Sequence, residues 1–121
     1  MSKTNPDKRA KELHALLNPI TQRQVTIAVG NTTENISLVG TSENQMRKVI
    51  KENLLDHEMV AKPDVDTHAE EDIITSAERL ALNLTEIGAS RAVCLDCEEL
   101  LKEKGIDIKT ELSGKKSKKR Q

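Results

Sequence analysis

Two short motifs in this 121-residue chain contain side chains that bind metal ions. The first is His68-Ala69-Glu70 and the second is Cys94-Leu95-Asp96-Cys97. Cysteines three residues apart in the first turn of a helix point the same way and can hold one ion. With His68 as a third ligand, a zinc ion keeps its fourth position open for water, as catalytic zinc sites do. Glu70 is poorly placed to bind the same ion, so its expected role is to move protons.

Two other interpretations of these motifs stay open. The cysteine pair could be a redox dithiol, although such pairs usually follow a thioredoxin-like strand. A structural zinc site could form if His14 or His57 supplied a fourth ligand. The interval between His68 and Cys94 is long enough for a helix, a strand and two turns, and this favours the catalytic zinc site. We also expect the helix starts to lower the pKa of the cysteine thiols.

The N-terminal half is predicted to hold a helix, a β-hairpin and a second helix. The first helix lies within residues 1–19, begins at Asn5-Pro6, and has an apolar face of Ala10, Leu13, Leu16 and Leu17. Alternating apolar residues predict a hairpin over residues 24–39. Ser42 is the expected N-cap of a helix whose apolar face holds Met46, Val49, Ile50 and Leu54. Residues 56–66 are acidic and contain Pro63, which indicates a loop.

The second half is predicted to carry both motifs at helix starts. Thr67 is the expected cap of a helix that begins at His68, and its buried stripe is Ile73, Ile74, Ala77, Leu80, Ala81 and Leu84. A strand over residues 87–93 follows, then a helix from Cys94 to Lys104-Gly105 and a last strand over residues 106–110. Strand-helix-strand units favour parallel pairing. The predicted class is α/β, in three layers, with a central mixed sheet of about four to five strands flanked by helices.

Composition excludes several functions. The chain has no Phe, Tyr or Trp, so it cannot stack nucleic-acid bases on aromatic rings. Residues 1–112 carry 14 basic and 20 acidic side chains, a net charge of −6, whereas residues 113–121 carry +5. An acidic body with a short basic tail, which we expect to be disordered, is not typical of a strong duplex binder. Two cysteines make no disulfide scaffold, and we expect neither a signal peptide nor a membrane span.

The motif pair, on a helix-strand-helix pattern, resembles the signature H-x-E…P-C-x-x-C of the zinc-dependent cytidine deaminase superfamily. The resemblance covers about residues 20–112, which would be the deaminase domain. The stretches T-H-A-E-E-D at residues 67–72 and S-R-A-V-C-L-D-C at residues 90–97 look like deaminase domains at the C-termini of bacterial polymorphic toxins. Val93 stands where the signature has proline, a departure that removes no ligand.

The resemblance implies a role for each matching residue. His68, Cys94 and Cys97 would bind Zn²⁺, and Glu70 would pass protons between water, ring N3 of cytosine and the leaving amine. The backbone of Ala69 could lie against the base. The candidates for holding the sugar and flanking phosphate are Ser42, Asn44, Ser90 and Arg91. Simpler explanations compete for three of these: a helix cap for Ser42, a surface residue for Asn44 and a solvated charge for Arg91.

Three classes of function follow from the resemblance. The first is a cytosine deaminase of nucleic acid, with single-stranded DNA favoured over RNA and duplex DNA. It would be a secreted toxin domain that acts in the cytoplasm of a target cell, with an immunity protein as partner and no membrane association. The second is a free cytidine or nucleotide deaminase of pyrimidine salvage. The third is a non-catalytic zinc-binding module, which Glu70 disfavours because such a module needs no carboxylate there.

Overall fold

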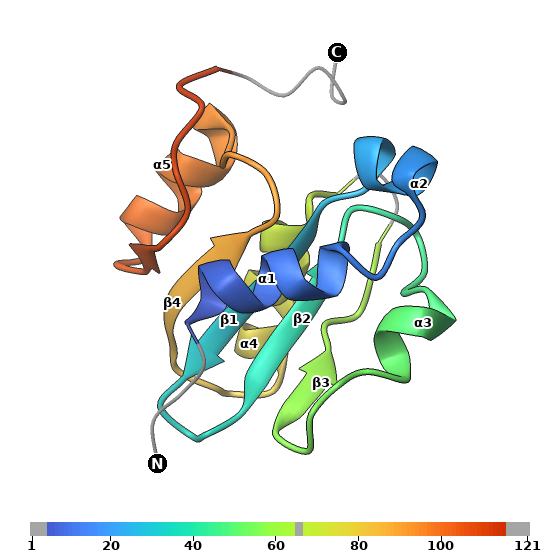
Figure 1. Ribbon diagram of the computed structural model, residues 1–121. Helices are drawn as coiled ribbons and strands as arrows, with labels where there is room; N and C mark the ends of the chain where they lie inside the picture. The colour runs from blue at the N-terminus through green and yellow to red at the C-terminus, as the bar shows by residue number, and fades with distance from the viewer. Residues whose placement is uncertain (1–4, 65–66, 116–121) are drawn as a thin grey trace.

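The computed structural model describes residues 5–64 and 67–115, and a five-stranded sheet lies at its centre (Figure 1). The strand order is β3-β2-β1-β4-β5. β1 is antiparallel to both neighbours, whereas β3 pairs parallel with β2 and β5 pairs parallel with β4. The strands are β1 (Ile27–Thr32), β2 (Ser37–Thr41), β3 (Glu58–Val60), β4 (Leu84–Ala89) and β5 (Asp107–Ile108). This mixed sheet confirms the predicted α/β class.

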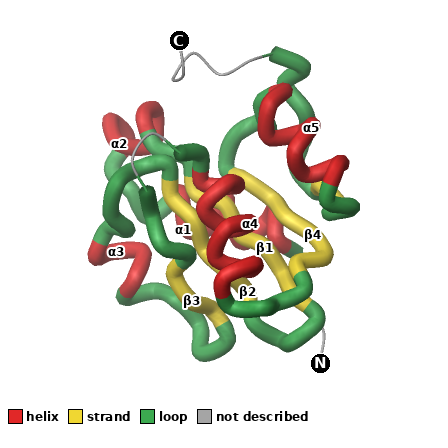
Figure 2. The backbone as a smooth tube through the Cα atoms, turned by 180° about the vertical axis from the view of Figure 1, so that it is seen from behind, coloured by secondary structure: helices red, strands yellow, loops and turns green. Residues whose placement is uncertain are grey.

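Helices cover both faces of the sheet and complete three layers. The helices are α1 (Pro6–His14), α2 (Pro19–Gln24), α3 (Lys48–Lys51), α4 (Ala69–Arg79) and α5 (Leu95–Glu103). Side chains of β1 alternate between the faces, so that Ile27 and Val29 pack with α1 and α3 while Ala28 packs with α4 and α5. Figure 2 shows α4 lying across the side opposite to α1. No helix among the described residues is long and apolar enough to cross a membrane.

A partly buried ion pair fastens α1 to the edge strand β3. The Arg9 guanidinium donates to both carboxylate oxygens of Glu58 at 2.8 and 2.9 Å, and the side chains are 13% and 1% exposed. Burial acts to raise the pKa of Glu58, but hydrogen bonds from Arg9 and from the Leu55 N–H outweigh it and hold the pKa below its usual value. The pair explains how an acidic residue can be buried in this edge strand.

That strand is a correction to the sequence prediction, which assigned residues 56–66 to a loop. The expected helix within residues 1–19 is also shorter, since α1 ends at His14 and leaves Leu16 exposed. The Asn18 side chain accepts from the Thr21 N–H and starts a separate helix, α2, which was not predicted and whose last residue, Gln24, was expected to begin the hairpin. Residues 1–4 of the predicted helix lie outside the described residues.

Boundaries around the two motifs also differ from the prediction. Ser42 caps no helix, because α3 begins six residues later at Lys48. His68, not Thr67, is the N-cap of α4. Leu84 belongs to β4, which ends at Ala89 instead of residue 93. The last strand is shorter than predicted, since β5 spans two residues.

Candidate metal centre

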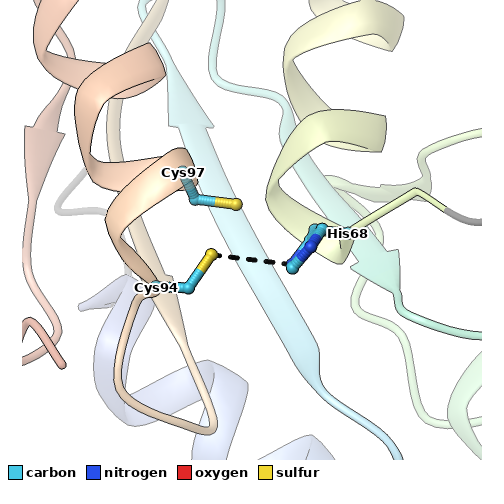
Figure 3. Close-up of side chains that lie close together, drawn as sticks. All are labelled: His68, Cys94 and Cys97. Carbon is cyan, nitrogen blue, oxygen red and sulfur yellow. Dashed lines mark hydrogen bonds between the residues drawn. The ribbon is translucent and has the colours of Figure 1, made fainter. Parts of the chain in front are cut away.

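Three side chains from two helix starts converge on one point (Figure 3). His68 is the N-cap of α4, Cys94 is the N-cap of α5, and Cys97 lies in the first turn of α5. One ligand atom from each lies within 4.8 Å of the others. Cys94 Sγ lies 3.8 Å from His68 Nδ1. The structure therefore brings together the three residues that the motifs predicted as metal ligands.

Strand direction explains this convergence. β2, β3 and β4 all run opposite to β1, so their C-terminal ends lie at the same edge of the sheet. The segment after β3 leads to His68, and the loop after β4 leads to Cys94. Gly40 in β2 lets α4 begin directly on the sheet, since a Cβ there would lie 2.5 Å from the carbonyl oxygen of Ala69. A side chain at position 40 would push the start of α4, and with it His68, away from the cysteines.

Local hydrogen bonds fix the backbone beside His68. The Glu71 carboxylate accepts from the His68 N–H at 2.8 Å, which is half of a capping box. The Thr67 hydroxyl donates to Asp72 Oδ1 at 2.5 Å. Burial raises the pKa of Asp72 to about 6. Neither acidic partner was predicted from the sequence, although a Glu three residues after an N-cap is a recognisable signal.

The turn that carries Cys94 is held by the segment that follows β5. The Val93 N–H donates to the Glu111 carbonyl, and the Val93 carbonyl accepts from the Ser113 N–H, each at 2.9 Å. The Leu95 N–H donates to the Lys115 carbonyl, also at 2.9 Å. The predicted boundary at residue 112 therefore falls inside a segment that is bound to the metal centre through residue 115. The rest of the predicted tail, residues 116–121, lies outside the described residues.

The donor set and its spacing fit zinc. Zn–N and Zn–S bonds of about 2.0 and 2.3 Å at tetrahedral angles separate the two donors by about 3.5 Å, close to the observed 3.8 Å. Cys97 is 2% exposed. Burial first, and then the charge of Glu70, raise the pKa of the Cys97 thiol, against the expectation that the helix start lowers it. A cation beside the thiol would offset both effects, so metal binding and proton release would be coupled.

Glu70 lies inside the protein next to this centre without joining the ligand group. Glu70 is 4% exposed. Burial raises the pKa of its carboxyl group, and the charges of Glu71 and Asp72 act in the same direction. Its charge also acts on the Cys97 thiol. A buried carboxyl group whose pKa is raised holds a proton more readily than an exposed one, which suits it to proton transfer.

Neither histidine proposed as a fourth ligand lies in the centre. Within residues 5–64 and 67–115, the His68, Cys94 and Cys97 group contains no further His, Cys, Asp or Glu ligand. His14 Nε2 instead lies 2.9 Å from the carbonyl oxygens of both Gln22 and Val25. The described residues thus form a three-ligand set.

Two of the predicted substrate residues fasten the start of β1. Ser42 Oγ accepts from the Thr26 N–H, and Ser90 Oγ accepts from the Ile27 N–H, both at 2.9 Å. Ala69 is fully buried in the core. The serines therefore hold the loops after β2 and β4 at the sheet edge where the metal centre lies.

The other two predicted substrate residues are exposed. Arg91 donates to the Gln22 carbonyl at 3.0 Å and so ties the loop before Cys94 to α2. Asn44 lines an open hollow of about 930 Å³ together with Ser42 and the basic residues Arg47, Lys48 and Lys51. These three cations were not predicted as a site, although residues 47–51 have the basic spacing R-K-x-x-K.

Comparison of the chain with protein-family models, curated proteins and solved structures finds no match. The motifs and the geometry around them are therefore what bears on function.

Proposed function

We propose that the chain is a zinc-dependent hydrolase that converts cytosine to uracil in single-stranded DNA. The observation that carries the proposal is the His68, Cys94 and Cys97 cluster at two helix starts, with the buried Glu70 two residues after the histidine. The resemblance of these motifs to the cytidine deaminase signature supplies the reaction. The three-ligand set supports catalysis over a structural site, because four-ligand sites leave no position for water.

In the proposed reaction, water adds to C4 of cytosine and ammonia leaves, so that cytosine and water give uracil and ammonia. Zinc, when bound, would lower the pKa of the attacking water and make it nucleophilic at neutral pH. Glu70 takes a proton from that water and delivers it to ring N3; it then takes the proton of the hydroxyl added at C4 and passes it to the leaving amine. Because Glu70 is buried, bulk water has little access to its carboxyl group during these transfers.

Composition supports single strands over duplex DNA. A paired and stacked base must be flipped out, which costs a few kcal/mol. The chain has no aromatic side chain to fill the gap, and its first 112 residues are acidic. The proposal extends to a secreted toxin domain, active in the cytoplasm of a target cell and neutralised there by an immunity protein.

The test compares initial rates of uracil formation on matched single-stranded DNA, duplex DNA, RNA and free cytidine at one salt concentration. We expect single-stranded DNA to react fastest. Glu70→Gln keeps the shape of the side chain, and it should abolish the reaction while the zinc content stays near one per chain. Glu99→Gln, an exposed position on α5, is the matched control and should leave the rate unchanged.

Either of two results would overturn the proposal. One is zinc-loaded protein that forms no uracil on any of the four substrates. The other is a Glu70→Gln rate within tenfold of the starting rate. A free-cytidine rate well above the polymer rate would instead place the chain among the salvage enzymes.

A further inference from the structure

The hollow beside α3 has a chemistry that the metal centre does not explain. Its volume is about 930 Å³, and Arg47, Lys48 and Lys51 contribute three cations against one anion, Glu43. The remaining lining residues are uncharged: Ser42, Asn44, Gln45 and Met46. The net charge of the lining is therefore +2, in a chain whose first 112 residues carry −6.

One wall of the hollow is attached to the same edge of the sheet as the loop that carries Cys94. Ser42, in its wall, lies two residues beyond Gly40, the residue on which the start of α4 packs. Two residues of extended chain span about 7 Å. Ser42 is also fixed to Thr26 at the start of β1, whose next residue, Ile27, is fixed to Ser90 in the loop before Cys94. A strand of nucleic acid that follows this edge of the sheet from the metal centre would run toward the wall that Ser42 forms.

Two of the three cations are available for a ligand. Arg47 is already paired within the protein, since its guanidinium donates to both carboxylate oxygens of Glu43 at 2.8 and 2.9 Å. The Lys48 side chain is 87% exposed and lies 3.9 Å from Glu52, a weak contact. Lys51 is also exposed. Ammonium groups on flexible stems bind phosphate as point charges, which suits a backbone held without base specificity.

We infer that this hollow holds the phosphodiester backbone of the single-stranded DNA beside the reacting cytosine, with Lys48 and Lys51 on successive phosphates. The exposed Asn44 amide lies between the lysines and the sheet edge in sequence and can reach a sugar or phosphate oxygen. The inference rests on the proposed function for the identity of the strand. It explains how an acidic protein without aromatic residues can hold a single strand.

The test measures binding without catalysis. The probe is a fluorescent oligothymidine, which contains no cytosine, and the readout is anisotropy between about 50 and 200 mM salt. The variant is Lys48→Gln with Lys51→Gln. The matched control, Lys104→Gln with Lys109→Gln, removes the same charge from exposed lysines at the far end of α5 and beside β5.

We expect the salt slope to fall by about 1.4 in the variant, at about 0.7 for each lost single-strand phosphate contact. The ratio of parent to variant affinity should then shrink by about sevenfold across this fourfold range of salt. The control should keep the parent slope. Melting temperatures of both double variants should match the parent, because all four lysines are on the surface.

An unchanged slope in the variant, or an equal loss in the control, would overturn the inference. The outcome is separable from that of the proposed function. If the parent binds oligothymidine with the predicted variant effect but forms no uracil, the hollow binds DNA and the deaminase proposal fails. If the parent forms uracil in DNA and the variant slope is unchanged, the inference about the hollow fails alone.

Discussion

Removal of residues 113–121 should damage the metal centre, whereas removal of residues 116–121 should not. The longer deletion takes away the Ser113 N–H that donates to the Val93 carbonyl and the Lys115 carbonyl that accepts from the Leu95 N–H. These two hydrogen bonds flank Cys94. At about 0.5–1.5 kcal/mol each, their loss costs about 1–3 kcal/mol. For a chain of this size that lowers the melting temperature by about 5–15 °C.

The assay compares both truncations with the full chain by thermal melting and by zinc affinity in competition with a chelator. Deletion after Lys115 is the charge control, because it removes four of the five basic residues of the tail and neither hydrogen bond. Zinc should bind more weakly to the longer deletion only. Equal melting temperatures and equal zinc affinities for the two truncations would refute the argument that this segment positions Cys94.

Three further substitutions test the centre and the fold. Cys97→Ser should lower bound zinc from about one per chain to near zero by metal analysis, and unchanged zinc would remove Cys97 from the ligand set. Glu58→Gln should lower the free energy of unfolding by about 2–3 kcal/mol, measured by urea denaturation, because Arg9 loses a charged partner. The pKa of Glu58 is lowered from 4.5 in the folded state, so this stabilisation is present at neutral pH and lost as pH falls through the folded pKa. If the difference in unfolding free energy between parent and variant does not shrink in acid, the ion pair is not its source. Gly40→Ala places a methyl group against the Ala69 carbonyl, which should lower the free energy of unfolding by about 1–3 kcal/mol and also weaken zinc binding. An unchanged zinc affinity would show that this contact does not position His68.

The ligand set could be predicted from the sequence because its signal is local. Cys94 and Cys97 are one helical turn apart, and a helix start can be recognised from the pattern that follows it. The pairing of His68 with them follows from two strand-helix units in one sheet. The class of fold could be predicted for the same reason, since alternation and helical periodicity are local properties.

The features that could not be predicted depend on contacts far apart in the sequence. β3 has acidic residues around it and shows no strand pattern. Glu58 can be buried there because it pairs with Arg9, which lies 49 residues earlier and gives no local signal. The attachment of Leu95 to Lys115 likewise joins segments twenty residues apart. The hollow at α3 requires three cations to lie on one surface of a four-residue helix and its N-cap, which periodicity cannot establish over so short a span.

The direction of β1 explains why the loop before the cysteines of α5 and the loop that lines the hollow at α3 lie at the same edge of the sheet. Because β1 opposes both of its neighbours, β2 and β4 point the same way, and the loops that follow them reach one edge of the sheet. Ser42 and Ser90 attach those two loops to adjacent residues at the start of β1. The loop that lines the hollow at α3 and the loop that leads to the cysteines of α5 are therefore both hydrogen-bonded to residues 26–27. A shift of that backbone would move both attached loops together, which would preserve the spacing between the proposed binding surface and the proposed metal centre.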